Sequence, residues 1–232
     1  MPARTIPDSV AGTFITLEGI DGSGKSTQLR LLSSFLRTSG CDIVVTREPG
    51  GTPLGQRLRA ALLDAQEHVD PLTELLVFAA DRAQHVRRVV RPALERNRIV
   101  LSDRYADATR AYQGAGRGFS DQLVSELVEL ATEGLKPDLT LLFDLPIEQC
   151  MKRTSRRNGR HKTDRLDAED AEFHSRVRNA YLRFAADEPH RIRLIDSSGT
   201  VQETHEAVKQ VLIPFLRSRG YVLTGSQEPQ PS

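Results

Sequence analysis

The chain has 232 residues, of which 38% are hydrophobic and 27% are charged, so it can bury the core of one ordinary domain. Its 32 lysines and arginines nearly balance 31 aspartates and glutamates, and the net charge of +1 lacks the basic excess of a nucleic-acid-binding or membrane-surface protein. No apolar run is long enough for a transmembrane helix, and the first residues lack the hydrophobic block of a secretory signal, so we expect a cytoplasmic protein without a membrane partner.

Short β-branched runs alternate with longer amphipathic stretches along the chain, which is typical of a parallel sheet covered by helices on both faces. The predicted strands are 14–18, 43–46, 99–102, 139–143 and 192–195. The predicted helices are 26–38, 72–95, 121–133, 169–187 and 201–217. The polar, proline-containing end GSQEPQPS predicts a disordered tail.

A glycine-rich segment directly follows the first predicted strand. Residues 19–26 read GIDGSGKS and fit G-x-x-x-x-G-K-[ST], whose backbone N–H groups cradle phosphates at the start of a helix. The Lys25 ammonium is expected to reach the β- and γ-phosphates, and the Ser26 hydroxyl to bind Mg²⁺. This P-loop predicts ATP or GTP binding. The residues assigned to the nucleotide are Gly19, Ile20, Asp21, Gly22, Ser23, Gly24, Lys25, Ser26 and Thr27.

A P-loop needs an acidic partner for its magnesium ion, and three predicted strands end in an aspartate. The candidates are Asp103, Asp144 and Asp196. Spacing alone cannot choose between them, because the choice depends on which strand lies beside the P-loop strand. We favour Asp103, because Arg104 and Tyr105 follow it and bring a charge-neutralising and a stacking group to the same strand end, where α/β sheets bind ligands.

Other side chains predict a second, phosphate-bearing substrate. The turn TREPGGT carries Arg47, whose N–H donors can grip an anionic group. Phe78 and Arg82 are four residues apart and share one helix face, where a ring can stack on a base and a guanidinium can donate to its carbonyl edge. The alternatives are that Phe78 is a core residue and that Arg82 forms an ordinary salt bridge.

The basic run near residue 155, the cysteines and the histidines indicate a function less clearly. Six lysines or arginines and no acidic residue lie within 152–162, which alone favours a solvated helix end. The two cysteines, Cys41 and Cys150, are too few for a disulfide framework, and we expect both to be buried. The six histidines show no ligand spacing, so zinc is not implied.

Taken together, FITLEGIDGSGKST, TREPGGT, the F-x-x-x-R pair, DRY with AYQG after it, and PDLTLLFDLP resemble the thymidylate kinase family. The resemblance covers about 13–217 and leaves an N-terminal extension, 1–12, and a C-terminal tail, 218–232. It implies an α/β P-loop nucleoside monophosphate kinase fold with a five-stranded parallel sheet. It also implies a homodimeric enzyme that transfers the γ-phosphoryl group of ATP, bound with Mg²⁺, to thymidine 5′-monophosphate in deoxynucleotide synthesis.

By motif, the resemblance also implies which side chains bind dTMP, and that Asp103 organises Mg²⁺. The implied dTMP contacts are Asp21 with the sugar 3′-hydroxyl, Arg47 and Arg104 with the phosphate, Phe78 and Arg82 with the base, Tyr105 with the deoxyribose, and Thr109 and Gln113 with the base. The family usually carries Ser or Asn where Thr109 stands, which affects the base contact more than the choice of substrate.

The resemblance gives the basic run a specific role. Family members keep a catalytic basic residue either inside the P-loop or in a lid, and Gly22 cannot supply one. We therefore expect a lid at about 153–165, in which Arg156, Arg157 and Arg160 act on the transferring phosphoryl group and Arg153 lies against adenine. This pattern is typical of the bacterial-type subgroup.

Three alternatives stay open. A kinase of the same fold for another monophosphate would keep Lys25, Ser26 and Asp103 without needing the base-reading set. A binding module that uses nucleotide as a switch would be expected to lose Lys25, Asp103 or the lid arginines, and this sequence keeps them all. A GTPase would be expected to carry an NKxD motif, which this sequence lacks.

Overall fold

The computed structural model describes residues 12–63, 65, 68–158, 166 and 169–224, with the backbone alone at 156–158. The strands are β1 (Thr13–Glu18), β2 (Ile43–Arg47), β3 (Ile99–Asp103), β4 (Leu139–Asp144) and β5 (Ile192–Asp196). The helices are α1 (Lys25–Thr38), α2 (Pro53–Leu63), α3 (Pro71–His85), α4 (Arg91–Leu94), α5 (Ala106–Thr109), α6 (Asp121–Thr132), α7 (Ile147–Asn158), α8 (Ala171–Asp187) and α9 (Val201–Ser218). Two π-helical segments are η1 (Val86–Val90) and η2 (Arg110–Gly116).

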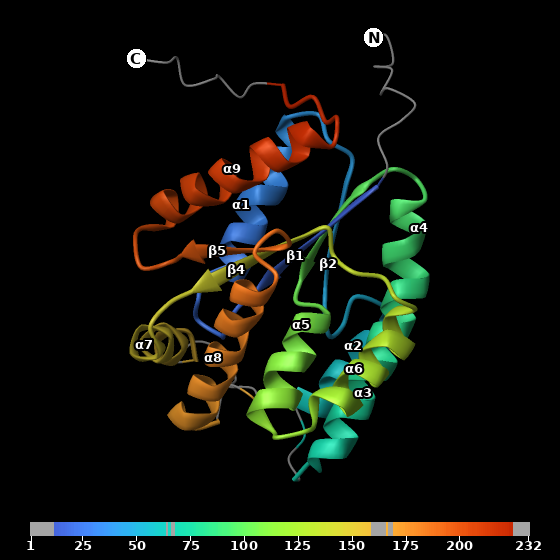
Figure 1. Cartoon of the computed structure of the whole chain (residues 1–232), viewed down its shortest axis with the longest axis vertical. Helices are drawn as coiled ribbons and strands as arrows, with labels where there is room; N and C mark the ends of the chain where they lie inside the picture. Colours follow the sequence, from blue (N-terminus) through green and yellow to red (C-terminus); the bar gives the residue numbers. More distant parts are fainter. Residues whose placement is uncertain (1–11, 64, 66–67, 159–165, 167–168, 225–232) are drawn as a thin grey trace.

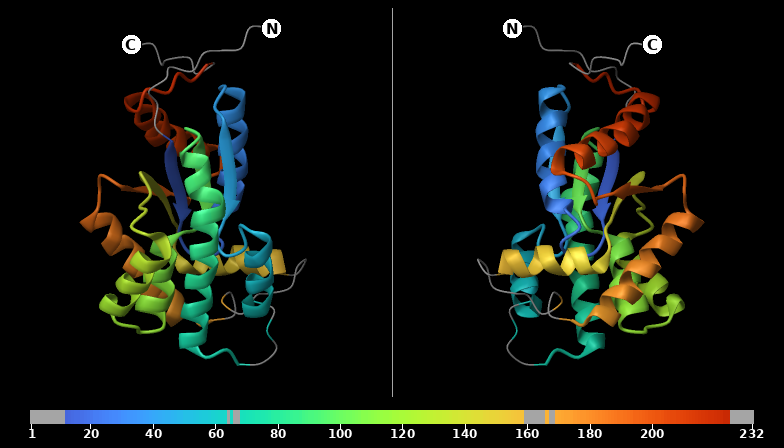
Figure 2. Two further views of the ribbon diagram at one scale, coloured as in Figure 1. Left: turned by 90° about the vertical axis from the view of Figure 1, so that its right-hand side faces the viewer. Right: turned by 90° about the vertical axis from the view of Figure 1, so that its left-hand side faces the viewer.

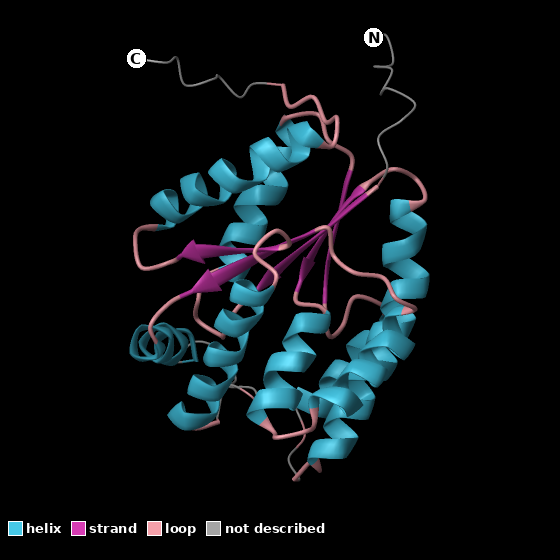
Figure 3. Ribbon diagram, in the orientation of Figure 1, coloured by secondary structure: helices cyan, strands magenta, loops and turns pink. Residues whose placement is uncertain are grey.

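The strands form one parallel five-stranded sheet in the order β2-β3-β1-β4-β5 (Figure 3). This confirms the predicted fold class and all five strands. The register pairs Leu17 of β1 with Asp103 of β3, so the P-loop and the end of β3 start from the same edge of the sheet. In parallel sheets that edge, at the carboxyl ends of the strands, is where ligands bind.

Helices cover both faces of the sheet, as the alternation of strands and helices predicts (Figure 1). Alternate strand residues such as Leu17 and Leu101 pack against Leu32 of α1 and Leu212 of α9 on one face. On the other face, Phe14 and Val100 pack against η1 and α4, while β4 packs against α8 and η2. Figure 2 shows α7 running crosswise beyond the carboxyl ends of the strands.

The predicted helix 72–95 is divided into α3, η1 and α4. Pro92 lies in the first turn of α4 and has no N–H to donate, and in a regular helix its ring would clash with the carbonyl of Arg88. A π-helical turn immediately before a proline widens the backbone there. The chain continues in the same direction, so Phe78 and Arg82 still share the α3 face.

Three helical segments were not predicted: α2, the pair α5 and η2, and α7. Gly55 interrupts the pattern of α2, and two glycines lie in η2. The predicted disordered tail and most of the N-terminal extension lie outside the described residues. Among the described residues, no helix is both long and apolar enough to cross a membrane.

Candidate active site

The P-loop connects β1 to α1 and holds its lysine inward. Gly19, Gly22 and Gly24 have φ angles of 133°, 84° and 99°, which a residue with a Cβ adopts only at a cost. The Lys25 ammonium, 5% exposed, donates to the carbonyl oxygens of Gly19 and Ile20, each at 2.8 Å. Burial and the charge of Arg104 lower the pKa of Lys25, although Asp21 opposes them. A cation lies at the centre of the loop, where a phosphate would replace the two carbonyls.

The structure distinguishes the three candidate aspartates by their partners. Asp103 accepts a hydrogen bond from the Ser26 hydroxyl at 3.0 Å, across the β1–β3 pair. Asp144 instead forms a two-pronged ion pair with Arg178, at 2.7 and 2.8 Å. Asp196 lies on the edge strand β5 and accepts the N–H of Ser198. Of the three, Asp103 is therefore the carboxylate beside the P-loop hydroxyl, as the sequence analysis favours.

A cavity in front of the P-loop is lined by that loop, α1, α7, the turn after β5 and the start of α9. Asp21 to Thr27 line it, and so does Arg153 of α7, whose guanidinium donates to the Ser197 carbonyl at 3.2 Å. The opposite wall comes from the turn after β5, with Ser197 and Gly199 to Val201. Sequence reasoning missed this turn as part of the site. The nucleotide cavity, as we call it, thus brings Arg153 to the P-loop.

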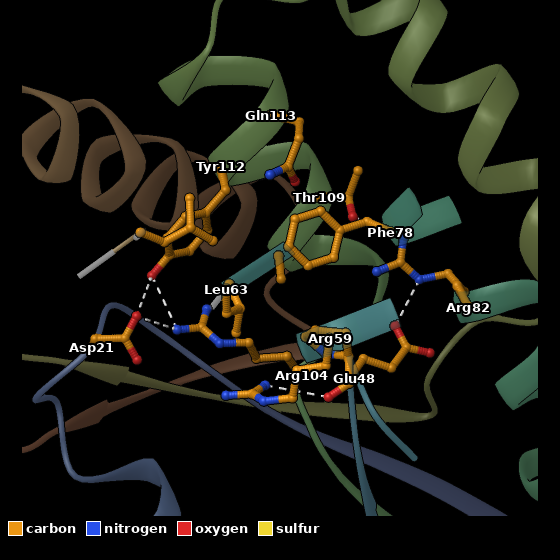
Figure 4. A pocket seen from close by; sticks show the side chains of 13 residues that line it. Asp21, Glu48, Arg59, Leu63, Phe78, Arg82, Arg104, Thr109, Tyr112 and Gln113 are labelled. Carbon is orange, nitrogen blue, oxygen red and sulfur yellow. Dashed lines mark hydrogen bonds and ion pairs between the residues drawn. The ribbon is translucent and has the colours of Figure 1, made fainter. Parts of the chain in front are cut away.

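A second cavity opens on the other side of Asp21 (Figure 4). Its lining includes six of the eight predicted dTMP contacts: Asp21, Phe78, Arg82, Arg104, Thr109 and Gln113. Asp21 lines both cavities, so they meet at the P-loop. We call this second space the acceptor cavity.

Arg82 is fixed in the wall of the acceptor cavity by three different acceptors. Its Nε donates to Glu48 at 2.8 Å, Nη1 to the Thr109 hydroxyl at 2.8 Å and Nη2 to the Tyr105 carbonyl at 2.9 Å. Glu48 also pairs with His85 at 2.7 Å. Burial alone raises the pKa of Glu48, but Arg82 and His85 outweigh it and lower that pKa. The plane of the guanidinium is thus set before any ligand binds, rather than free as in a surface salt bridge.

Arg104 crosses the acceptor cavity toward the P-loop. Its Nη2 donates to Asp21 at 2.7 Å and to the Tyr112 hydroxyl at 3.1 Å, and its guanidinium lies 4.8 Å from the centre of the Tyr112 ring. The Tyr112 hydroxyl donates to Asp21 at 3.2 Å as well. Asp21 therefore accepts from Arg104 of the DRY motif and from Tyr112 of the AYQG motif, and Figure 4 shows the three side chains converging.

Two predicted contacts do not line the acceptor cavity. The Tyr105 ring is fully buried against Phe14, at 4.8 Å between ring centres, and its hydroxyl donates to the Leu135 carbonyl. The Tyr105 ring therefore points into the core and not into the acceptor cavity that the prediction assigns to it, whereas Tyr112 lines the cavity. Arg47 is exposed at the end of β2, while Arg59 of α2 lines the cavity. Both Tyr112 and Arg59 come from helical segments that were not predicted.

The proposed lid begins on α7, which packs on the P-loop. The side chains of Arg156 and Arg157, and all of Arg160, lie outside the described residues, so their catalytic roles stay predictions. Gly22 is close to α7: a Cβ there would lie 2.5 Å from the Cys150 carbonyl oxygen. Packing therefore leaves no room for a basic side chain at this P-loop position.

The two cysteines lie outside both cavities. Cys150 is buried, which raises its pKa to about 11, but Cys41 is half-exposed, contrary to expectation. Cys41 lies in the turn between α1 and β2 and packs only partly against the core cluster of that face. Within the described part of the chain, no cluster of three His, Cys, Asp or Glu residues is placed to hold a metal ion.

The P-loop at a parallel-sheet edge, the Ser26–Asp103 pair and an adjoining second cavity define a P-loop nucleoside monophosphate kinase fold. The sequence model of the thymidylate kinase family matches residues 17–208. The chain is 48% identical over 209 residues to a thymidylate kinase of Geotalea uraniireducens, covering 88% of this chain and 98% of the relative. It is 52% identical over 195 residues to one of Desulfosudis oleivorans, covering 82% and 91%.

The solved structures agree with these sequence matches. A crystal structure of thymidylate kinase from Ehrlichia chaffeensis superposes with a TM-score of 0.73 at 35% identity, covering 87% of this chain and 99% of that one. The chain therefore belongs to the thymidylate kinase family, as its motifs indicate.

Proposed function

We propose that this protein transfers the γ-phosphoryl group of ATP to thymidine 5′-monophosphate, giving dTDP and ADP for DNA synthesis, with the side chains of the two cavities in the roles below. The observation that carries the proposal is the position of Asp21, because it lines both cavities. A donor in one cavity and an acceptor in the other would meet beside Lys25 and Arg104. Family membership supports the same activity.

The nucleotide cavity is the proposed ATP site. Its backbone N–H groups and Lys25 would hold the triphosphate, and Arg153 would lie against adenine opposite the turn after β5. Mg²⁺ would be held by Ser26 and Asp103, because a hydroxyl and a carboxylate oxygen 3.0 Å apart suit an ion that keeps most of its other ligands from water and phosphate. When bound, the ion neutralises phosphate charge.

The acceptor cavity is the proposed dTMP site. Phe78 would stack on thymine, and Arg82, Thr109 and Gln113 would border its polar edge. Tyr112 takes the place proposed at first for Tyr105, since its ring lines the cavity and its hydroxyl reaches the Asp21 carboxylate that would receive the sugar 3′-hydroxyl.

The phosphate end of dTMP would lie at Arg104. Arg47 remains a proposed phosphate ligand that would have to turn inward from the end of β2, and Arg59 already lies in the wall. Of these three arginines, Arg104 is the one that reaches Asp21, where the two cavities meet.

Catalysis would follow from positioning and charge. Phosphoryl transfer needs little covalent chemistry from a protein, so aligning two bound phosphates can supply roughly 7–11 kcal/mol of the barrier reduction. Lys25 would move from the Gly19 and Ile20 carbonyls to the phosphates. Arg156, Arg157 and Arg160 would add charge from the lid, in the bacterial-type arrangement.

We also propose a cytoplasmic homodimer without a nucleic-acid partner, which matches the near-zero net charge and the use of ATP. Large apolar side chains are exposed on two adjacent helices, α3 and α6, and these helices contact each other. They are Leu72, Leu76, Leu123 and Leu130, exposed by 47%, 48%, 36% and 76%. A second copy would cover them.

A coupled assay of ADP release tests the activity with ATP and a panel of acceptors: dTMP, dUMP, UMP, CMP, AMP and GMP. We expect turnover with dTMP to exceed that with every ribonucleotide. A better ribonucleotide substrate would favour another monophosphate kinase of this fold, and binding of nucleotide without ADP release would favour the switch module.

A further inference from the structure

Arg104, the proposed ligand of the acceptor phosphate, has an unusual backbone conformation. Its φ angle is 71°, in the left-handed region that an arginine rarely occupies. Such a conformation persists only where its surroundings hold it, and it is frequent where a side chain must be aimed at a ligand. Here it turns the guanidinium back from the end of β3 toward Asp21 in the P-loop.

Three hydrogen bonds pin the peptide groups on either side of Arg104. Its own N–H donates to the Leu17 carbonyl at 3.0 Å, and its carbonyl accepts from the Ser102 hydroxyl at 2.8 Å. The next N–H, that of Tyr105, donates to Oε1 of Glu18 at 2.7 Å. The last of these bonds is the one in which a side chain from another strand reaches the turn.

Glu18 is placed to make this contact and no contact with substrate. It is the last residue of β1, is fully buried, and lines neither the nucleotide cavity nor the acceptor cavity. Its other oxygen, Oε2, accepts from the Tyr181 hydroxyl of α8 at 2.7 Å, which fixes the carboxyl group in the gap between β1 and α8. Burying a carboxyl group costs free energy unless it forms hydrogen bonds, and both oxygens of Glu18 accept a short one.

We propose that Glu18 is a positioning residue for Arg104: by accepting the Tyr105 N–H, it holds the left-handed turn that aims the Arg104 guanidinium at the acceptor phosphate and Asp21. The proposal rests on the acceptor role proposed for Arg104. Glu18 thereby links the P-loop strand, the DRY segment and α8, so that the donor and acceptor sites keep one relative geometry.

The required property of Glu18 is an acceptor oxygen rather than a charge. Burial and the nearby Asp107 raise its pKa to about 7, while Arg104 and the two donors pull that pKa down. The Tyr105 N–H can only donate, whereas the Tyr181 hydroxyl can donate or accept. A protonated Glu18, or a glutamine, can therefore keep both contacts, with one oxygen toward Tyr105 and an O–H or N–H toward Tyr181.

This predicts a definite order among variants in steady-state kinetics with dTMP and ATP. Glu18→Met has nearly the same volume and no strong acceptor, and we expect it to raise KM for dTMP by about 10- to 100-fold, because a displacement of about 1 Å at a site of this kind costs up to that much. KM for ATP should change far less, because Arg104 does not line the nucleotide cavity. Glu18→Gln should restore KM for dTMP to near the original value.

A matched control is available at the opposite end of β1. Asp138 also accepts a backbone N–H of this strand, that of Phe14, at 2.7 Å. Asp138→Leu should lower the melting temperature without a selective rise in KM for dTMP. If E18M and D138L both lose stability and neither changes the ratio of the two KM values, Glu18 is merely structural and the proposal is wrong.

Two further variants keep the test decisive. If E18M does not fold, Glu18→Asp replaces it, because a side chain one methylene shorter cannot reach both donors; an unchanged KM for dTMP there overturns the proposal. Arg104→Ala tests the proposed function separately. If KM for dTMP rises in R104A but not in E18M, the role proposed for Glu18 is wrong and that of Arg104 stands. If KM for dTMP is unchanged in R104A, the role proposed for Arg104 is wrong, and Glu18 then has nothing to position.

Discussion

Gly22 of the P-loop lies directly against the carbonyl of Cys150 in α7: a Cβ on this glycine would be 2.5 Å from that oxygen and 2.9 Å from the Thr154 hydroxyl. The helix that leads into the basic segment therefore packs closely on the phosphate-binding loop, through its backbone at Cys150 and the side chain of Thr154. This contact excludes a P-loop arginine here, and it makes the position of α7 depend on a single glycine.

Gly22→Ala is expected to be harmful for two reasons, its φ of 84° and the contact with α7. We expect a loss of roughly 1–3 kcal/mol from backbone strain alone, a further loss from displacement of α7, and a lower kcat. Gly118→Ala is the matched control, because Gly118 has a φ of 83° and open space where its Cβ would lie. Equal losses of stability in the two variants, with normal kcat in G22A, would show that the α7 contact is unimportant.

The P-loop lysine gives a second prediction. Lys25→Met keeps most of the side-chain volume and removes the ammonium that donates to Gly19 and Ile20. Because that charge would act mainly on the transferring phosphoryl group, kcat should fall by about 10²-fold or more, while circular dichroism shows a folded protein. Near-normal turnover would contradict the assignment of the P-loop.

The Arg82 guanidinium gives a third prediction, on base selectivity. Thymine presents a carbonyl at C4 and cytosine an amino group, so a fixed donor should favour dTMP over dCMP. Arg82→Ala alone would leave the buried Glu48 with His85 but without the permanent charge of Arg82, and breaking such a buried ion pair commonly costs about 3–5 kcal/mol. The variant to measure is therefore Arg82→Met with Glu48→Gln. We expect KM to rise more for dTMP than for ATP, with much of the preference over dCMP lost. Equal changes for dTMP and ATP would show that Arg82 does not read the base.

Stability against pH gives a fourth prediction, through Glu18. Its pKa is about 7 in the folded protein against 4.5 ordinarily, because burial and then Asp107 raise it. Between these values the folded state binds more protons than the unfolded state, so the stability that Glu18 contributes is full below about pH 4.5 and is lost as the pH rises through about 7. The free energy of unfolding should be measured with urea at about pH 5 and about pH 8. Between these two values it should fall by up to about 3 kcal/mol more in the unchanged protein than in Glu18→Gln.

Comparison of the two proteins isolates Glu18, since other shifted groups titrate in both. Asp81, whose burial and proximity to Glu48 raise its pKa to about 6, contributes a loss of the same sign to parent and variant alike. The groups that face Glu18 are Asp107, Arg104, Tyr181 and the Tyr105 N–H, all unchanged in the variant. An identical pH dependence for the two proteins would mean that Glu18 has an ordinary pKa.

The strands of the sheet, and the P-loop that directly follows the first of them, could be predicted from the sequence. All five strands were predicted within one or two residues, because each is a short run rich in β-branched and aliphatic residues that is separated from the next by an amphipathic helix or a turn signal. The choice of Asp103 over Asp144 was favoured by its neighbours, but only the strand order places β3 beside β1 and Asp103 on Ser26.

The acceptor cavity shows where sequence reasoning stops. Tyr105 and Tyr112 are seven residues apart in one segment, and nothing in their spacing tells which ring faces the cavity. The answer depends on the extended backbone at Tyr105, which directs the first ring onto Phe14, and on the π-helical turn η2, which directs the second toward Asp21. Arg59 was missed for a related reason, because the proline and glycine of α2 hide its helical pattern.

The last prediction concerns the proposed lid. Gly22 cannot supply a charge from the P-loop. Besides Lys25, the cationic groups proposed to act on the transferring phosphoryl group are therefore the arginines that follow Arg153. Arg156, Arg157 and Arg160 can partly replace one another, so all three should be changed to alanine together. Arginines that act on phosphoryl transfer are worth about 10³–10⁵ in rate, and a contact from a loop can give less.

A catalytic lid predicts a large loss of kcat that added salt does not reverse, with little change in dTMP binding. A solvated face predicts a loss below about tenfold that fades with salt, because exposed charges are screened within about 10 Å at 0.1 M. The kinetics should therefore be repeated at low and high ionic strength, and the small, screened effect would return this segment to a surface role.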